Sequence, residues 1–437
     1  MQPPGNIKSA FKTSLRILLC AFLLVGCELG PSRKITVRFW NGFTGPDGRT
    51  MLKIVKRFNR ENPDIRVLMQ RMDWGTYYNK LFVAGIGNRA PEVFIIHAGN
   101  IERFMQANFI RTIDDLVAGE NGMDTRDFSE NIWNAVEKNG RHYGLPLDVH
   151  IIGMYYNRAL FRKAGIVDEK GEPKPPETRE EFLDALSRLT KDANGDGQND
   201  TWGFVLTWYW TNLYSLMCQW EGKFFTPDND KCLLNSPENV EALQFCVDLI
   251  RKYKYSPPPE NFDSWIGFRQ GKVGIAFEGI YMLADLERQK DLDFAGAPMP
   301  VLGKVPAAWA DSHILCLKTG LEDKKLDAAW RFMRYLSDNS LDWAEGGQVP
   351  VRSSLCSTER FRNMKIQWEF AKQIPYIRYV PRVPFIFEYG QEFNVGVEKA
   401  LRGTLSPKQA LDEAAENVNK IIERRNKMIE ENLKRRP

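Results

Sequence analysis

Histidine is scarce in this chain, which holds only four among 437 residues, at positions 97, 142, 150 and 313. So small a number leaves little material for a zinc site or for histidine-based catalysis. The sequence also lacks a Gly-x-Ser-x-Gly elbow, a His-Glu-x-x-His motif and a phosphate-binding loop. The common signatures of hydrolases and nucleotide-binding enzymes are therefore missing, whereas catalysis by a pair of carboxylates is not excluded.

Cysteine provides no framework either. Of the seven cysteines, Cys20 and Cys27 lie close to the N-terminus. The other five cysteines are Cys218, Cys232, Cys246, Cys316 and Cys356. Because their number is odd, their spacing is irregular and no Cys-x-x-Cys pair occurs, they predict neither a disulfide framework nor a metal cage. One disulfide, such as Cys218 to Cys232, is the alternative.

The first residues read as an export signal. Lys8, Lys12 and Arg16 precede an apolar run, Ile17 to Val25, that is too short to span a bilayer as a helix. The run leads into Leu24-Val25-Gly26-Cys27, which resembles the bacterial lipobox. We therefore predict a signal peptide over 1–26, lipidation at Cys27 and a tether over 27–34, which would anchor the protein in the periplasm or at the cell surface. An ordinary signal peptide with a chance cysteine is the alternative.

Long apolar runs and excess charge are absent from the rest of the chain, so we expect a soluble body. Residues 1–26 carry three basic side chains and no acidic one, and their removal lowers the formal charge from +4 to +1. This balance argues against a nucleic-acid partner, which requires a basic face. About 410 mature residues exceed one ordinary hydrophobic core and favour two lobes.

The mature chain begins with alternating strands and helices. Ile35 to Trp40 alternates as a strand does, Met51 to Phe58 has helical spacing, Ile65 to Met69 is a second strand, and Pro91 to Ile96 is an apolar run of buried-strand length. This order predicts a doubly wound α/β lobe. Ligands of such sheets bind at the carboxyl ends of the strands, which draws together Trp40, Asn41, Asp73, Trp74 and His97.

A second lobe is predicted to follow residues 143–147, with Ile151 to Tyr156 as a strand. Thr178 and Glu181 form a capping box, and Ser236-Pro237 and Ser406-Pro407 mark two further helix starts. Gly271 to Phe277 and Phe294 to Pro298 are short buried-strand patterns after a proline break.

Several local patterns, in order along nearly the whole mature chain, are similar to family-1 extracellular solute-binding proteins, the maltose-binding-like sugar receptors of ABC importers. The patterns lie at residues 39–41, 140–146, 155–165, 235–239, 268–279, 348–352 and 401–407. The resemblance implies a type II periplasmic-binding-protein fold, α/β with two lobes joined by hinge crossings. We expect a first lobe of residues 35–148 and 275–325, and a second lobe of 149–274 and 326–437.

The resemblance also implies a function. It predicts a monomeric lipoprotein that captures a mono- or oligosaccharide between its lobes and delivers it to the membrane permease, with no catalysis and no required cofactor. A sugar site needs flat aromatic rings for the C–H face and planar polar groups for the hydroxyls. The chain holds twelve tryptophans.

The strongest local concentration of rings is Thr207 to Asn212, and in the resembled family this stretch lines the cleft, which implicates Trp208, Tyr209 and Trp210. Such rings are otherwise core residues, as we expect for Trp330 and Trp343. Near Glu278 and Gly279 the nearby ring is Tyr281, where the family has a tryptophan. Strand ends and the positions used by the family add further candidate residues: Trp40, Asn41, Asp73, Trp74, His97, Asn100, Asp148, Trp265, Glu278, Gly279, Trp309, Asp311 and Arg352.

A separate stretch resembles a calcium loop. Oxygen-bearing side chains recur at Asp192, Asn194, Asp196, Gln198 and Asp200, with Gly197 at the sixth position, as in an EF-hand loop. The twelfth position is Gly203 in place of the bidentate glutamate. We expect a structural calcium ion or, as the alternative, a metal-free polar turn.

Two other functions fit the same residues. A secreted glycosidase would need two carboxylates about 5–10 Å apart, and a surface adhesin would bind polysaccharide without a transporter. Release of product from an oligosaccharide would indicate the enzyme, whereas binding to an immobilised polymer without closure would indicate the adhesin.

Overall fold

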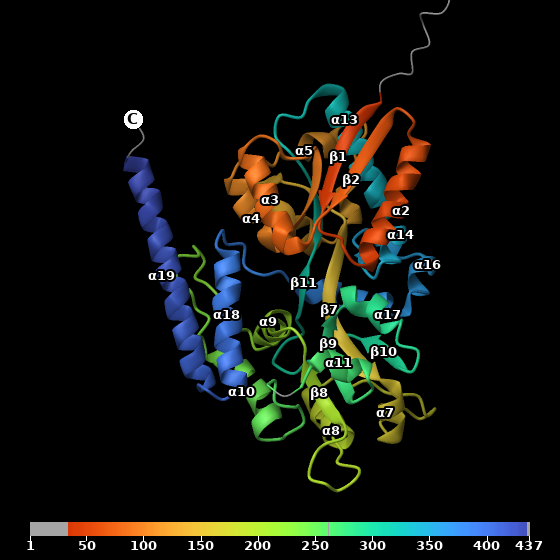
Figure 1. Ribbon diagram of the computed structural model, residues 1–437, viewed down its shortest axis with the longest axis vertical. Helices are drawn as coiled ribbons and strands as arrows, with labels where there is room; N and C mark the ends of the chain where they lie inside the picture. Colours follow the sequence, from red (N-terminus) through yellow and green to blue (C-terminus); the bar gives the residue numbers. More distant parts are fainter. Residues whose placement is uncertain (1–33, 261, 435–437) are drawn as a thin grey trace, which may run out of the picture.

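The computed structural model describes residues 34–260 and 262–434 and has two lobes, each built around its own sheet (Figure 1). The predicted signal peptide, Cys27 and nearly all of the predicted tether lie outside the described residues. No helix within the described ranges has the length and apolar character needed to cross a membrane.

The first sheet has five strands in the order β2-β1-β3-β12-β6. Its strands are β1 (Ile35–Asn41), β2 (Ile65–Arg71), β3 (Val93–His97), β12 (His313–Leu317) and β6 (Leu145–Pro146). β1 pairs in parallel with β2 and β3, as the strand-helix-strand order predicts, and β12 adds antiparallel to β3. The carboxyl ends of β1 and β3 therefore meet the start of β12 at one edge, which faces the second lobe.

Helices cover both faces of this sheet. Phe332 of α13 packs edge-on against Phe39 of β1 and Phe58 of α2, with ring centroids 5.2 and 5.1 Å apart. On the other face, α3 buries Tyr77 and Leu81. The helices of this lobe are α2 (Pro46–Glu61), α3 (Trp74–Ile86), α4 (Ile101–Gln106), α5 (Asp114–Ala118), α6 (Glu130–Trp133), α13 (Asp323–Asp338) and α14 (Ser340–Ala344).

The second sheet is organised around β7 (Asp148–Asn157), which is buried along its whole length. The strand order is β14-β11-β7-β9-β8, and β10 and β13 also pair with β7. The other strands are β8 (Trp202–Leu206), β9 (Val273–Gly279), β10 (Phe294–Ala297), β11 (Ala308–Asp311), β13 (Val349–Pro350) and β14 (Ile377–Arg378). Two short strands, β4 (Glu137–Lys138) and β5 (Arg141–His142), form a separate hairpin.

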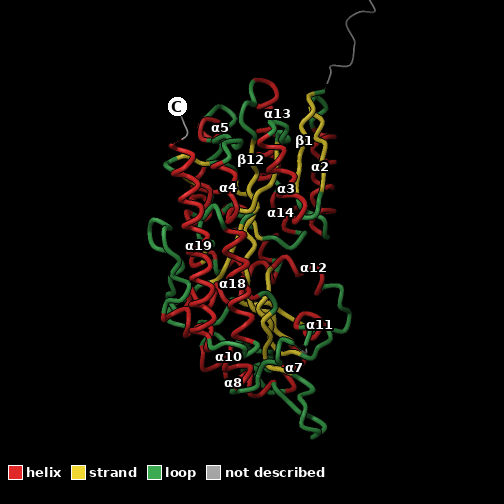
Figure 2. Tube along the Cα trace, turned by 60° about the vertical axis from the view of Figure 1, so that its left-hand side comes forward, coloured by secondary structure: helices red, strands yellow, loops and turns green. Residues whose placement is uncertain are grey.

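Helices surround the second sheet, and the last two run side by side along the molecule (Figures 1 and 2). These two are α18 (Ile386–Leu401) and α19 (Pro407–Lys434). The others are α7 (Arg158–Lys163), α8 (Arg179–Leu189), α9 (Tyr209–Gln219), α10 (Pro237–Arg251), α11 (Ser264–Arg269), α12 (Leu283–Leu286), α15 (Ser353–Cys356), α16 (Glu359–Arg362) and α17 (Lys365–Ala371).

The chain crosses between the lobes along β7, along the consecutive strands β11 and β12, and again between α14 and β13, which pairs with β7. The expected return to the first lobe at residue 275 is wrong, because β9, β10 and β11 belong to the second sheet and only β12 joins the first. The assignment of residues from 326 onward to the second lobe is wrong for α13 and α14, which pack on β1 and α2. Buried strands of the two sheets have the same apolar pattern, so the sequence does not specify the sheet to which each belongs.

The helix starts that the sequence predicted at Thr178 and Ser236 are confirmed. The Thr178 side chain accepts from the Glu181 backbone N–H at 3.2 Å, although the Glu181 carboxylate bonds the N–H of Glu177 and not that of Thr178. Ser236 caps α10 with Pro237 at its first position. All five cysteines of the described residues are free thiols, so the bridge between Cys218 and Cys232 is not formed.

Candidate functional site

A cleft of about 580 Å³ lies where the two lobes meet the crossing strands. The first lobe contributes the segment after β1, the start of α3 and the end of β3, and the second lobe contributes the start of α9 and the turn after β9. The lining residues are Gly42, Thr44, Gly45, Asp47, Trp74, His97, His150, Trp208, Trp210, Thr211, Tyr281, Trp309, Asp311, His313, Gly346 and Gln348.

Aromatic rings from both lobes form the walls of the cleft. Trp208, just before α9, is 54% exposed, whereas Trp210 packs its edge against Phe393 on α18. On the first lobe, Trp74 lies against the backbone at Gly42, where a Cβ atom would stand 2.1 Å from the indole. Glycine at position 42 therefore permits the close approach that places Trp74 in the cleft.

The polar side chains of the cleft are three histidines, three hydroxyl groups, two acids and one amide. Asp311 Oδ1 accepts from the backbone N–H groups of Gly99 and Ser312, and burial raises the pKa of its carboxyl. Burial likewise raises the pKa of Asp47. Among the described residues, the Trp309 indole N–H and Gln348 Oε1 are buried without a hydrogen-bond partner. Such groups gain when a ligand supplies the missing partner.

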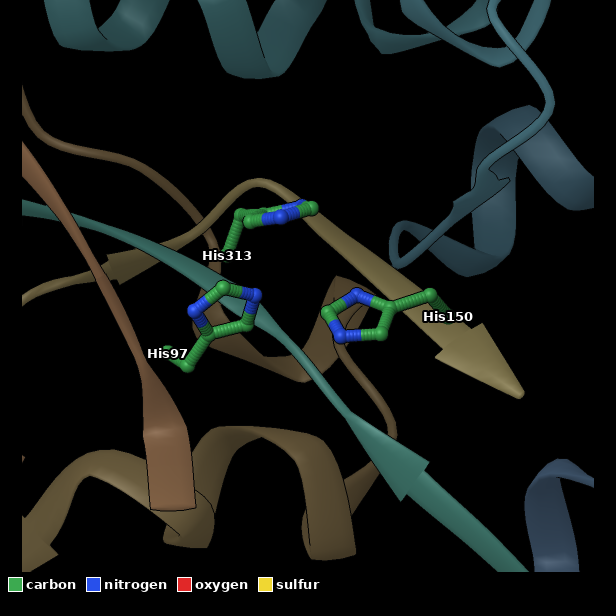
Figure 3. Close-up of side chains that lie close together, drawn as sticks. All are labelled: His97, His150 and His313. Atoms are coloured by element: carbon green, nitrogen blue, oxygen red, sulfur yellow. The ribbon is translucent and has the colours of Figure 1, made fainter. Parts of the chain in front are cut away.

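Three histidines meet at the floor of the cleft (Figure 3). His97 ends β3, His313 begins β12, and His150 lies near the start of β7. Their ring centroids are 4.5–5.3 Å apart. One ring nitrogen from each lies within 4.8 Å of the others. The sequence offers few histidines for a metal site, and the fold gathers three of the four at this one place.

Asp148 lies beneath this cluster and is fully buried. Its carboxylate contacts His313 Nδ1 at 2.7 Å and His150 Nδ1 at 3.3 Å, and the Trp343 indole donates to it at 2.5 Å. Burial opposes ionisation of Asp148, but His313 and His150 outweigh it and hold the pKa of that carboxyl below its usual range. Burial, followed by the neighbouring His313 and His150, lowers the pKa of His97.

The structure brings six of the predicted site residues to the cleft: Trp74, His97, Trp208, Trp210, Trp309 and Asp311. The predicted core residues Trp330 and Trp343 are confirmed, with exposed fractions of 2% and 1%. The other predicted residues do not line the cleft; they are Trp40, Asn41, Asp73, Asn100, Asp148, Tyr209, Trp265, Glu278, Gly279 and Arg352.

Several of these residues lie next to the lining and shape the segments that form it. Asn41 is buried and its Oδ1 accepts from the Phe43 backbone N–H, which shapes the segment after β1. Asp73 accepts from the Gly75 N–H and caps α3, the helix that begins with Trp74. Trp40 packs under Lys80, and Asn100 ends the short helical turn after β3.

Other predicted residues have different structural partners. Arg352 Nε and Nη1 pair with Asp127 and Asp338 at 2.7 and 2.6 Å. The Trp265 indole donates to Asp285 at 3.0 Å. Tyr209 is half-buried at the start of α9, outside the cleft lining.

Glu278 is buried behind the second-lobe wall. Its Oε1 accepts from the Gly279 N–H at 2.8 Å, whereas its Oε2 has no partner among the described residues. Burial raises the pKa of Glu278 to about 7, although the hydrogen bond from the Gly279 N–H acts in the opposite direction. A Cβ at Gly279 would stand 2.1 Å from the Tyr281 ring. Gly279 therefore lets Tyr281 turn into the cleft.

Sequence reasoning missed ten residues of the lining, of which Tyr281 had been noted only as a neighbouring ring: Gly42, Thr44, Gly45, Asp47, His150, Thr211, Tyr281, His313, Gly346 and Gln348. Thr44 and Asp47 lie between the first strand and the first helix, in a segment rich in glycine, asparagine and proline (residues 41–48), so their position carried a usable signal. His150 and His313 carried none, because only the pairing of distant strands brings them to His97.

The calcium-like loop is exposed at the far end of the second lobe. Its carboxylates accept backbone N–H groups of the loop itself: Asp192 from Gly195 and Gly197, Asp196 from Gln198, and Asp200 from Ala193. Asn194 Oδ1 accepts from the Asp196 N–H. Calcium binding by Asp192, Asn194, Asp196, Gln198 and Asp200 stays a prediction.

Known proteins resemble the chain over most of its length. The family model for bacterial extracellular solute-binding proteins matches residues 43–340. The sn-glycerol-3-phosphate-binding periplasmic protein UgpB of Escherichia coli strain K12 is 23% identical over 421 residues, which cover 89% of this chain and 93% of that protein.

Solved structures have the same architecture. The sugar-binding protein MalE of Xanthomonas citri matches with a TM-score of 0.79 at 20% identity, covering 90% of this chain and 99% of that one. An ABC substrate-binding protein of Listeria monocytogenes in complex with cycloalternan gives a TM-score of 0.76 at 20% identity, covering 89% and 99%. These likenesses establish the two-lobed periplasmic-binding-protein fold.

Proposed function

Because the chain belongs to the bacterial extracellular solute-binding protein family, we propose that it captures a neutral carbohydrate between its lobes and delivers it to the membrane permease of an ABC importer. The observation that carries this proposal is the composition of the cleft. Its walls present Trp74, Trp208, Trp210, Tyr281 and Trp309, and its polar lining consists of acids, amides, hydroxyls and histidines.

Each kind of group matches one part of a sugar. Indole faces stack on the C–H face of a pyranose ring, whereas carboxylates and amides accept and donate hydrogen bonds at the hydroxyls around its rim. The unpartnered Trp309 N–H and Gln348 Oε1 add one donor and one acceptor to this set. A small number of polar groups among aromatic walls is the usual composition of a specific ligand site.

A phosphorylated polyol is the second candidate, because the similar UgpB is named for binding sn-glycerol 3-phosphate. A phosphate group is normally held by arginine, lysine or a helix N-terminus. Among the described residues, the cleft lining includes no lysine or arginine, whereas it includes Asp47 and Asp311. The charge of the cleft therefore favours an uncharged ligand.

The proposal includes export and anchoring. UgpB is a periplasmic protein by name, and a receptor that serves a membrane permease works outside the inner membrane. The basic and apolar segments before Cys27 support a cleaved signal and a diacylated cysteine, and two acyl chains give stable attachment where one does not. The protein would then diffuse in two dimensions near its permease.

A thermal-shift screen across mono- and oligosaccharides tests the ligand class. A saccharide present at 100 times its dissociation constant is expected to raise the free energy of unfolding by about 2.7 kcal/mol and to raise the melting temperature accordingly. The same concentration of sn-glycerol 3-phosphate is expected to leave the melting temperature unchanged. A shift with the phosphate and none with any saccharide would contradict the proposal.

Incubation with the saccharide that binds separates the receptor from the alternatives. We expect the saccharide to be recovered intact, because a receptor releases its ligand unchanged. Chromatographic detection of shorter products would indicate a glycosidase using acids such as Asp47 and Asp311. Binding only to an immobilised polymer would indicate an adhesin.

A further inference from the structure

The three histidines of the cleft floor have the arrangement of a metal site. Strand pairing fixes their positions: His97 faces His313 across the β3–β12 pair, and Asp311, two residues before His313, faces His150 across β11–β7. Ligands placed on strands are held more precisely than ligands placed on loops. All three rings turn toward one another in Figure 3.

Each ring has one nitrogen already engaged behind the cluster. The Nδ1 atoms of His313 and His150 contact Asp148, and Nδ1 of His97 contacts the Tyr78 hydroxyl. The hydrogen bonds of these three rings to other described residues use Nδ1 and not Nε2. Metal-binding histidines characteristically give their second nitrogen to a carboxylate or another acceptor, which fixes the tautomer and frees the opposite nitrogen for the ion.

The charges around the cluster also favour a cation. Asp148 is fully buried, and its partners in the described chain are two histidines, a backbone N–H and an indole N–H, without lysine or arginine. Asp47 and Asp311 line the same cleft. A buried carboxylate is costly unless a positive charge compensates it.

We propose that His97, His150 and His313 bind one divalent transition-metal ion of the zinc, nickel or cobalt class at the floor of the cleft. Imidazole nitrogen suits these ions, whereas calcium and magnesium require oxygen ligands. One nitrogen from each ring lies within 4.8 Å of the other two, whereas tetrahedral zinc needs its nitrogens about 3.4 Å apart, so the rings would have to move closer when the ion binds.

Three protein ligands leave a fourth coordination position, which opens toward the solute because all three histidines line the cleft. A water molecule or an oxygen of the bound solute completes the coordination. The ion would also join the edge of the first lobe, through His97 and His313, to the crossing strand β7, through His150. The site does not depend on which solute the protein carries.

Calorimetric titration of the chelator-stripped protein with zinc chloride tests the proposal. We expect one ion per chain, and we expect His150→Gln and His313→Gln each to weaken its affinity at least a hundredfold. Asp148→Asn is expected to weaken it 10- to 100-fold, because the carboxylate orients two of the rings. His142→Gln is the matched control: His142 stacks on Trp133 and bonds Asp114, outside the cluster, and its loss should leave the affinity unchanged.

Cobalt titration of the unsubstituted protein provides a readout that does not depend on the folding of any variant. Four-coordinate Co²⁺ gives intense visible absorption, which zinc should then abolish by displacement. Should His150→Gln fail to fold by circular dichroism, His97→Gln, at a less buried position, replaces it. Absence of a stoichiometric ion, or equal losses in His142→Gln and the cluster variants, would overturn the proposal.

Discussion

Alanine in place of Trp208 is expected to weaken saccharide binding about thirtyfold while leaving the melting temperature of the free protein nearly unchanged. The Trp208 indole is 54% exposed and lines the cleft, so it adds little to the stability of the folded protein. Its removal would take away the ring on which a bound sugar stacks. Truncating an aromatic anchor of this kind costs about 2 kcal/mol or more in binding. Isothermal titration measures the affinity, and a melting curve measures the stability.

Trp265→Ala is the matched control for this experiment. Trp265 is also a partly exposed tryptophan that the sequence suggested for the site, but its indole bonds Asp285 outside the cleft lining. We expect its removal to lower the melting temperature and to leave the affinity for saccharide unchanged. Equal affinity in Trp208→Ala and the unsubstituted protein, or a loss only in Trp265→Ala, would remove Trp208 from the site.

The substitution Glu278→Gln is expected to stabilise the protein at pH 8 and to have little effect at pH 4. Burial raises the pKa of Glu278 to about 7 from an ordinary value of 4.5. Below pH 4.5 the carboxyl is protonated in both the folded and the unfolded chain, so it adds no pH dependence. Between 4.5 and 7 the unfolded chain releases its proton first, and stability falls as pH rises.

Above pH 7 this loss is complete and amounts to about 3 kcal/mol, by the conversion of a shifted pKa into free energy. Glutamine carries no charge to desolvate, so Glu278→Gln should recover most of that amount at pH 8. Urea unfolding at pH 4, 6 and 8 measures the difference from the unsubstituted protein. The exposed Glu388→Gln is the control, and a stability difference for Glu278→Gln that does not change with pH would contradict the burial account.

Local sequence signals predicted the strands and helices better than their partners in space. The alternation of residues 35–40 and the apolar run at 91–96 identified β1 and β3, and the signals at Thr178 and Ser236 identified the starts of α8 and α10. The lobe boundaries failed because β9 and β12 are equally buried and apolar, yet they pair in different sheets. Strand pairing depends on the packing of the whole chain.

In the candidate site, too, the residues with a local sequence signal were predicted and those brought together by strand pairing were not. Trp208 and Trp210 were predicted because aromatic residues concentrate after one strand, and Trp74 and His97 because they follow strand ends of a parallel sheet. His150 and His313 were missed because they come close to His97 only when β12 pairs antiparallel with β3 and β11 pairs with β7. Arg352 was over-predicted, since its ion pairs with Asp127 and Asp338 cannot be read from local sequence.

We expect the two lobes to close on a saccharide held between them, with motion about the segments that cross between the lobes, among them β7 and β11–β12. Small-angle X-ray scattering of the protein, with and without the saccharide that gives the largest thermal shift, measures this closure. We expect a smaller radius of gyration with the saccharide, and we expect Trp208→Ala to need about thirtyfold more saccharide for the same decrease. A radius of gyration that stays the same at saturating saccharide would contradict this expectation.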